Sequence, residues 1–248
     1  MANRQHYFIT GVSSGIGLAL TEQLVQAGHN VSGMARRGDR LATLSDRFDD
    51  FYAVTGDVTD EAQMTDAVKK AQAHHGAIDV FIPNAGLYIP SPANEIAVSD
   101  FAQHMAVNYM GVVNGLAAIL PAMQATGRGH IALMASVAGY RGLPRSAAYG
   151  PTKAALINLG EALRFDLQGS GVKIQIICPG FVETEATAVN DFAMPDIISS
   201  EEAARQIIQG LGQDKFEIAF PKSFARKMKW LKWLPNDTYF NIVKKITR

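Results

Sequence analysis

A tyrosine and a lysine lie four residues apart in the segment Tyr149-Gly150-Pro151-Thr152-Lys153. On an α-helix this spacing places both side chains on one face, one turn from each other. A free phenol has a pKa of about 10, and a fixed ammonium group nearby favours the phenolate. The pair could therefore exchange a proton with a substrate at neutral pH. Ser136 follows the apolar run 131–135, where its hydroxyl could hold a substrate oxygen beside Tyr149 or simply cap local backbone.

A glycine-rich turn, Thr10-Gly11-Val12-Ser13-Ser14-Gly15-Ile16-Gly17, lies between the first apolar run and the first amphipathic run. Gly11 can make a tight turn, Gly15 lets the backbone approach a pyrophosphate, and Gly17 permits close packing of helix on strand. The N-terminus of the following helix offers free N–H groups and about half a positive charge to an anion. A flexible turn is the simpler alternative, but the position between strand and helix favours a dinucleotide site.

The next motif concerns which dinucleotide is bound. Sites of this kind usually have an acidic residue about 20 positions after the glycines, where it binds the adenosine ribose. Counted from Gly15, that place falls on Ala35, and Arg36 and Arg37 follow. A guanidinium can bind a 2′-phosphate that a carboxylate would repel, so we predict NADP(H) over NAD(H), unless both arginines are ordinary solvated charges. Asp57 could hydrogen-bond the adenine amino group or cap the next helix.

These motifs need a scaffold, and short apolar runs alternating with longer amphipathic runs supply one. The predicted strands are 6–10, 30–35, 51–55, 80–83, 130–135, 173–178 and 216–220; the predicted helices are 16–27, 39–47, 61–75, 99–126, 149–169 and 200–211. This alternation predicts an α/β protein, a single-domain Rossmann fold with a doubly wound seven-stranded parallel sheet and helices on both faces. Ligands bind beyond the carboxyl ends of such strands, and each motif falls at such an end.

Together the motifs resemble the short-chain dehydrogenase/reductase family, and within it the carbonyl reductases. The resemblance runs from about residue 6 to residue 184 and is carried by Thr10-Gly11-x-x-x-Gly15-x-Gly17, Asp57, Asn84-Ala85-Gly86, Asn108, Ser136, Tyr149-x-x-x-Lys153 and Pro179-Gly180-x-Val182-x-Thr184. Pro83 departs from the pattern, because the family often has asparagine there. In this family residues 185–199 would form a lid over the substrate, although packing under a loop is an equally good interpretation.

The resemblance implies a catalytic tetrad of Asn108, Ser136, Tyr149 and Lys153. In the family the tyrosine is the general acid/base, the serine orients the carbonyl, and the lysine contacts the nicotinamide ribose and lowers the tyrosine pKa. Asn108 would hold a water of the proton relay, or it could only mark a helix kink. The implied cofactor-binding residues are Gly11, Ser13, Ser14, Gly15, Ile16, Gly17, Arg36, Arg37, Asp57, Val58, Asn84, Ala85, Gly86, Tyr149, Lys153, Pro179, Gly180, Val182 and Thr184.

The C-terminal part departs most from the family, so we divide the chain into a catalytic Rossmann domain, 1–221, and an extension, 222–248. The extension carries eight basic residues and one acidic residue, for a net charge of +7. Apolar residues at helical spacing predict two amphipathic helices broken at Pro235. Packing on the domain or on a partner is the interpretation we favour; contact with anionic membrane lipid, helped by Trp230 and Trp233, is the alternative.

Composition limits the remaining possibilities. Lysine plus arginine equals aspartate plus glutamate, 23 each, which gives no sign of nucleic-acid binding. A single cysteine, the lack of metal-ligand spacing, and no run resembling a signal peptide favour a metal-free cytoplasmic protein. We predict an NADPH-dependent oxidoreductase, a homodimer, that interconverts a small-molecule carbonyl and alcohol. The alternatives are a membrane-associated reductase of a lipid ketone and a non-catalytic NADP(H)-binding sensor.

Overall fold

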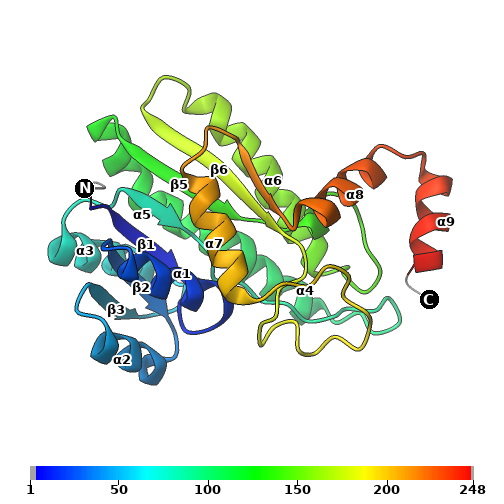
Figure 1. Ribbon diagram of the computed structural model, residues 1–248, viewed down its shortest axis with the longest axis horizontal. Helices are drawn as coiled ribbons and strands as arrows, with labels where there is room; N and C mark the ends of the chain where they lie inside the picture. Colours follow the sequence, from blue (N-terminus) through cyan, green and yellow to red (C-terminus); the bar gives the residue numbers. More distant parts are fainter. Residues whose placement is uncertain (1–3, 247–248) are drawn as a thin grey trace.

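The computed structural model describes residues 4–246, and for residue 246 the backbone alone. The fold is built around one parallel sheet. Within those residues the sheet has seven strands in the order β3-β2-β1-β4-β5-β6-β7 (Figure 1). The strands are β1 His6–Thr10, β2 Asn30–Ala35, β3 Phe51–Thr55, β4 Val80–Ile82, β5 Gly129–Met134, β6 Val172–Pro179 and β7 Glu217–Phe220. All pairings are parallel. The predicted doubly wound Rossmann fold is confirmed.

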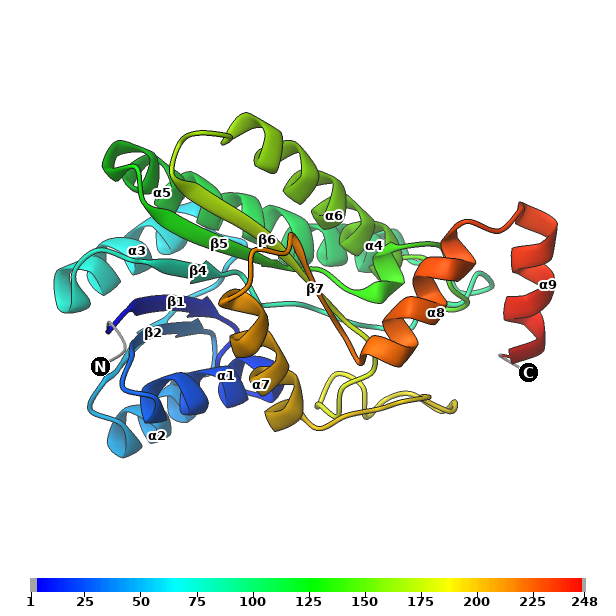
Figure 2. The same ribbon diagram turned by 45° about the horizontal axis from the view of Figure 1, so that its top comes forward.

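Helices cover both faces of this sheet. The elements before the C-terminal extension are α1 Gly15–Gln26, α2 Gly38–Arg47, α3 Glu61–His75, α4 Val98–Met105, the π-helix η1 Ala106–Met110, α5 Gly111–Thr126, the 3₁₀ turn η2 Val137–Gly139, α6 Tyr149–Asp166 and α7 Ser200–Leu211. Figure 2 shows α3, α5 and α6 on one face and α1, α2 and α7 on the other. This arrangement follows from right-handed crossovers that change direction after β3.

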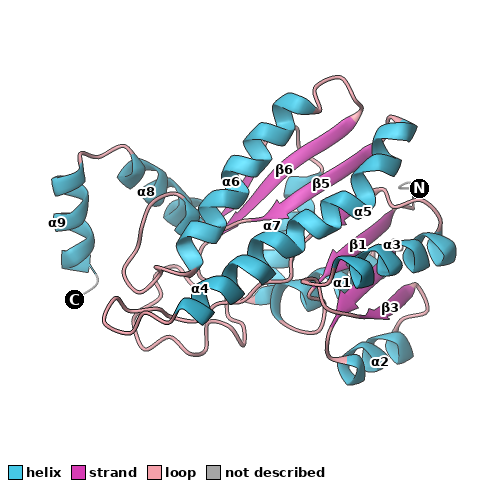
Figure 3. Ribbon diagram, turned by 180° about the vertical axis from the view of Figure 1, so that it is seen from behind, coloured by secondary structure: helices cyan, strands magenta, loops and turns pink. Residues whose placement is uncertain are grey.

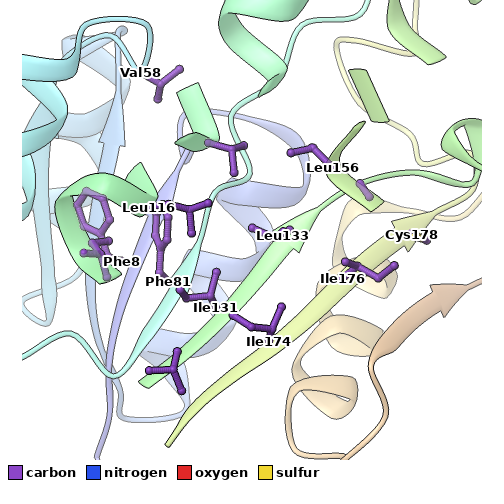
Figure 4. Close-up of a cluster of buried hydrophobic side chains, with 14 of the residues drawn as sticks. Phe8, Val58, Phe81, Leu116, Ile131, Leu133, Leu156, Ile174, Ile176 and Cys178 are labelled. Atoms are coloured by element: carbon purple, nitrogen blue, oxygen red, sulfur yellow. The ribbon is translucent and has the colours of Figure 1, made fainter. Parts of the chain in front are cut away.

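The core is divided between the two faces because successive strand side chains point in opposite directions. In β1, Phe8 belongs to the cluster under α3, α5 and α6, whereas Tyr7 and Ile9 belong to the cluster under α1 and α7. Figure 4 shows the first cluster, in which Phe81, Leu133 and other apolar side chains of the central strands meet. Burial on both faces explains why the central strands are almost continuously apolar in sequence.

The strand order reverses between β1 and β4, and this reversal creates the site. β1 runs beside both β2 and β4, so the loops that leave β1 and β4 diverge to opposite sides of the sheet. A crevice opens outside the carboxyl ends of two such strands, and ligands bind there in open α/β sheets. The glycine-rich turn leaves β1 and Asn84 follows β4, so both predicted motifs lie at this crevice.

The predicted helix over residues 99–126 differs from the structure in one respect. It begins at Val98, and the π-helix Ala106–Met110 interrupts its α-helical hydrogen bonding around Asn108. The stretch Val98–Thr126 is long enough to cross a bilayer, and an 18-residue window within it has a mean hydropathy of 1.4. Its buried side chains, among them Val112, Leu116 and Ile119, pack on the sheet as those of a core helix do. Its composition is therefore weak evidence for a membrane span.

The extension forms two helices, α8 Lys222–Lys232 and α9 Asn236–Ile246, separated at Pro235 as predicted. Figure 3 shows them projecting to one side of the sheet, with α9 farthest from it. Their inner side chains join the domain core through Ala225, Met228, Leu231, Tyr239 and Val243. The outer side carries Trp230, Trp233 and Phe240, which are 61%, 83% and 62% exposed. Arg248, counted in the charge of the extension, lies outside the described residues.

Candidate active site

The glycine-rich turn adopts a backbone that side chains would obstruct. Gly11 and Gly15 have φ angles of +74° and +56°, in the left-handed region. A Cβ at Gly11 would lie 2.8 Å from the Cα of Ala85, so the turn and the end of β4 are in close contact. Gly17 is buried, and a Cβ there would overlap the carbonyl of Gly11. Gly17 thus serves helix packing, whereas Gly11 and Gly15 face the cleft.

Polar groups after β4 hold this turn in place. The Asn84 side chain donates from Nδ2 to the carbonyl oxygens of Thr10 and Gly11, at 3.0 and 3.2 Å. The Ala85 N–H donates to Thr10 Oγ1 at 3.0 Å. Pro83 follows directly after β4, so its missing N–H costs no sheet hydrogen bond. The departure from the family pattern at Pro83 therefore leaves the position of Asn84 intact.

Arg37 is the arginine that joins the turn. Its Nε and Nη2 donate to Ser13 Oγ at 3.1 and 2.9 Å, and Nη2 donates to Ser14 Oγ at 2.7 Å. Ser14 occupies the N-cap position of α1, but its side chain makes no capping hydrogen bond. Arg36 is more loosely held: its side chain is 72% exposed, and Nη1 lies 3.9 Å from Asp57 Oδ2. Both arginines line the cleft, as predicted for groups that would meet a 2′-phosphate.

Two charged residues at this end of the cleft, Arg40 and Glu185, were not predicted from the sequence. Glu185 accepts hydrogen bonds from Arg37 at 2.8 Å and from Arg40 at 2.6 Å, which ties the loop after β6 to the start of α2. These two guanidinium groups lower the pKa of Glu185 to about 2. The spacing of Arg37 and Arg40 on the first turn of α2 was a signal for a shared anion. Nothing local pointed to Glu185, because it is distant in sequence.

Asp57 lies in the lining of the cleft, beside Val58. Its Oδ1 accepts from the backbone N–H and the hydroxyl of Thr59, both at 2.9 Å. The alternative that Asp57 caps the following helix is wrong, because Asp60 is the N-cap of α3 and accepts from the Gln63 N–H. Asp57 instead stabilises the turn before that helix, with Oδ2 facing Arg36.

The catalytic candidates Ser136, Tyr149 and Lys153 meet at the carboxyl end of β5. The strand ends at Met134, two residues before Ser136, which is the N-cap of a 3₁₀ turn. Ser136 Oγ accepts from the Ala138 N–H at 3.1 Å, and it also hydrogen-bonds with Tyr149. Ser136 therefore caps local backbone, and it also lies beside the phenol, where the predicted role toward a substrate oxygen would place it. Lys153 Nζ donates to the Met134 carbonyl at 2.7 Å and lies 5.6 Å from the Tyr149 ring centroid.

Burial dominates the acid–base properties of this pair. It raises the pKa of Tyr149 to about 12, against the opposing effect of the hydrogen bond with Ser136. It also lowers the pKa of Lys153 to about 8. The pKa of Tyr149 is thus above its ordinary value although Lys153 lies nearby, and the ammonium of Lys153 is itself buried and bonded to a carbonyl. At neutral pH Tyr149 is a phenol that carries its proton.

Asn108 lies one layer behind the cleft, fully buried in the π-helix. Its Nδ2 donates to the Leu87 carbonyl at 2.9 Å and to Thr152 Oγ1 at 3.1 Å, and its Oδ1 accepts from the Leu87 N–H at 2.6 Å. Both amide hydrogens are therefore used, and only oxygen atoms of Asn108 could bind a water. The residue also connects the loop after β4 to helix α6, which carries Tyr149.

One cavity of about 1110 Å³ unites these groups. Among the predicted site residues only Gly17 and Asn108 lie outside its lining. The predicted residues that line the cavity are Gly11, Ser13, Ser14, Gly15, Ile16, Arg36, Arg37, Asp57, Val58, Asn84, Ala85, Gly86, Ser136, Tyr149, Lys153, Pro179, Gly180, Val182 and Thr184. Sites for a single small molecule measure roughly 300–1000 Å³, so this cavity lies at or above the upper end of that range. No cluster of three metal-ligating side chains occurs within residues 4–246.

Comparison with known proteins identifies the family. Residues 5–193 match the family model described as short chain dehydrogenase. An uncharacterized oxidoreductase of Myxococcus xanthus is 33% identical over 235 residues, 93% of each chain. A short chain dehydrogenase from Burkholderia cenocepacia, solved in complex with NADP, superposes with a TM-score of 0.85 at 25% identity over 97% of each chain. A short chain dehydrogenase/reductase from Burkholderia phymatum, solved in complex with NAD, shares the fold, with a TM-score of 0.83 at 24% identity over 91% of this chain and 92% of that one. The chain therefore belongs to the short-chain dehydrogenase/reductase family of oxidoreductases.

Proposed function

We propose that this protein is an NADPH-dependent oxidoreductase that interconverts a carbonyl and an alcohol, with Tyr149 as the general acid/base. The observation that carries the proposal is that Ser136, Tyr149 and Lys153 line the same cavity as the glycine-rich turn. A protein that only bound the cofactor would not need a phenol and a buried ammonium in the same cavity. This argues against the non-catalytic sensor.

The residues present fit NADP(H). The left-handed glycines and the uncapped start of α1 would receive the pyrophosphate. Arg37, already held by Ser13 and Ser14, would bind the 2′-phosphate together with Arg36, and Asp57 and Val58 would lie beside the adenine. Lys153, Asn84–Gly86, Pro179, Gly180, Val182 and Thr184 would line the nicotinamide half. When bound, NADPH supplies the hydride that reduces the carbonyl carbon.

The chain's own groups would handle the carbonyl oxygen and its proton. Ser136 and Tyr149 would both donate hydrogen bonds to that oxygen, which polarises the carbonyl. Because its pKa is about 12, Tyr149 is protonated at neutral pH and can transfer its proton as charge develops on the oxygen. Lys153, one helical turn away, would stabilise the phenolate that remains. An oxygen of Asn108 would hold a water through which the phenol regains its proton.

The proposal is tested with a panel of ketones, aldehydes and alcohols assayed with NADPH and NADH by absorbance at the reduced nicotinamide band. We expect turnover with at least one carbonyl and a higher kcat/KM with NADPH than with NADH. Equal kcat/KM for the two cofactors would remove the NADP(H) assignment. Cofactor binding without turnover of any compound would favour the sensor.

A second candidate, a membrane-associated reductase of a lipid ketone, is supported by the exposed Trp230, Trp233 and Phe240 among the lysines of α8 and α9. Co-sedimentation with anionic and with neutral liposomes tests it, with a Trp230→Ser/Trp233→Ser variant as the comparison. Binding to anionic liposomes that the variant loses supports this candidate, and absence of binding by the unaltered protein removes it.

A further inference from the structure

The cavity that holds Ser136 and Tyr149 continues to the C-terminal extension. Phe224, Met228 and Leu231 of α8 and Val243 of α9 line it, more than seventy residues beyond Tyr149 in sequence. Each of these side chains is apolar, and Met228, Leu231 and Val243 are buried. The extension therefore contributes a wall to the catalytic cavity as well as covering the core.

The walls that face the extension are also apolar. Leu87, Val137 and Leu143 come from loops at the carboxyl ends of the strands, and Phe181 and Phe192 come from the segment after β6. The Phe181 ring lies 5.5 Å from the Phe224 ring and 6.0 Å from the Phe192 ring, measured between centroids. Phe181 thus joins the segment after β6 to the extension across the end of the cavity.

The charges near this end neutralise one another. Arg145 and Asp191, which both line the cavity, form an ion pair. Arg36, Arg37 and Glu185 lie at the opposite, cofactor-binding end of the cleft. A substrate with a charged group here would lose hydration without gaining a free partner among the described residues. The chemistry of the lining favours an uncharged, apolar group.

Arg141 holds the C-terminal extension against the loop that follows the Ser136 turn. Its Nη1 donates to the carbonyl oxygens of Leu231 and Leu234 at 3.0 and 2.7 Å, which satisfies acceptors at the end of α8. Its guanidinium stacks over the Tyr239 ring, 3.9 Å from the centroid, and the Tyr239 hydroxyl donates to the Gly142 carbonyl at 2.5 Å.

A second connection between this loop and the extension involves Tyr140, the residue before Arg141. Tyr140 donates to Glu217, which also pairs with Lys229 of α8. Since residues 140–142 follow the turn that begins at Ser136, the wall and the catalytic serine belong to one connected unit.

We propose that the C-terminal extension forms the far wall of the substrate site and that the substrate carries an extended, uncharged apolar group on its reacting carbon. The inference rests on the proposed function, and it adds the substrate class. The reacting oxygen would lie at Ser136 and Tyr149, and the apolar group would lie against Met228, Leu231 and Val243. Burying each additional methylene should raise kcat/KM roughly fourfold until the space is filled.

The test is a series of straight-chain methyl ketones of increasing length, assayed with NADPH, together with calorimetric binding of the matching secondary alcohols. We expect kcat/KM and alcohol affinity to rise together with chain length. Met228→Gln, similar in size but polar, should reduce kcat/KM for the long ketones about tenfold or more relative to the shortest ketone. Trp230→Gln, on the exposed side of the same helix, is the matched control. Val243→Asn replaces Met228→Gln if that variant fails to fold.

The outcomes separate this inference from the proposed function. Turnover of short ketones with no dependence on chain length would overturn the inference and leave the function standing. Equal effects of Met228→Gln and Trp230→Gln on the long ketones would also overturn it. Chain-length-dependent binding of the alcohols without turnover of any ketone would support the wall and contradict the proposed activity.

Discussion

The guanidinium of Arg37 has two sets of partners at the mouth of the cofactor cleft. Ser13 and Ser14 hold it beside the glycine-rich turn, and Glu185 pairs with it from the loop after β6. An incoming 2′-phosphate would compete with the Glu185 carboxylate for Arg37 and Arg40. Glu185 is ionised throughout the pH range of an assay, because its pKa is held at about 2. We therefore expect Arg37 and Glu185 to act in opposite directions on cofactor binding.

Arg37→Ala should raise the KM for NADPH roughly 10- to 100-fold, the effect of losing charged hydrogen bonds to a phosphate. Glu185→Gln should lower that KM about two- to fivefold, because it removes an exposed competing ion pair. The KM for NADH should change little in either variant, and Arg36→Ala, whose side chain is more exposed, should have the smaller effect. A KM for NADPH that rises in Glu185→Gln would show that this carboxylate supports the cofactor.

At the scale of elements, the site depends on contact between the Ser136 turn and helix α6. Gly139 lies in that turn, and a Cβ there would lie 2.7 Å from the backbone C and O of Lys153. These are backbone atoms of a helix and cannot rotate away, so a side chain at residue 139 would separate Ser136 from Tyr149. The turn and the helix can pack in contact because Gly139 has no side chain.

Gly139→Ala should therefore reduce kcat about 100-fold while NADPH binding changes little, since a displacement near 1 Å at the reacting groups has an effect of this order. Gly142→Ala, a few residues along the same loop, is the matched control because its Cβ would meet no atom within 4 Å. Steady-state kinetics and thermal unfolding of both variants make the comparison. Equal kcat in the two variants would contradict the account.

The bounds of the helices and strands show how much of the structure could be predicted from the sequence. Strands 6–10, 30–35 and 51–55 and the helix 61–75 match their predicted bounds, because apolar periodicity and terminal residues such as Asp60 are local signals. The π-helix at Asn108 could not be predicted, since it is set by hydrogen bonds from Asn108 to Leu87 and Thr152, far along the chain. The raised pKa of Tyr149 depends on burial, which sequence spacing alone does not report. Glu185 and the cavity-lining role of α8 likewise arise only when distant segments meet.

At the scale of the whole molecule, two partly buried histidines couple stability to pH. Burial lowers the pKa of both His75 and His130 to about 4 from the ordinary value of about 6.5. Both are neutral in the folded protein near pH 6, whereas the unfolded chain binds protons there. Their contribution to stability is full above pH 6.5 and is lost as the pH falls toward 4.

The Tm should accordingly decrease from pH 6.5 to pH 4, and His130→Leu should make the decrease shallower. Thermal unfolding followed by circular dichroism across this range measures both. The Nε2 atoms of His75 and His130 are buried without a hydrogen-bond partner, whereas the His130 side chain also interacts with Gln175, so His130→Leu removes that interaction together with the titrating group. An unchanged pH profile in His130→Leu would exclude this residue as a source of the acid sensitivity.

The resemblance to the family implies a homodimer in which the predicted helices 99–126 and 149–169 pair, and both stretches expose apolar side chains. Phe165 of α6 is 76% exposed, and Met105 and Met110 are exposed at either side of the π-helix. Light scattering should give the mass of a dimer, and Phe165→Glu should shift it toward a monomer at micromolar concentration. Trp233→Glu, which alters an exposed apolar side chain elsewhere, should leave the mass unchanged. A monomer in the unaltered protein would contradict the expected dimer.

Tyr149→Phe tests most directly whether Tyr149 transfers the proton while hydride reaches the carbonyl carbon. The substitution removes only the hydroxyl, so the ring can keep its edge-to-face contact with Tyr88. Single-turnover kinetics with NADPH should show a hydride-transfer rate lowered roughly 100- to 10,000-fold, and fluorescence titration should show an unchanged Kd for NADPH. A rate within about twofold of the unaltered protein would contradict the role assigned to Tyr149.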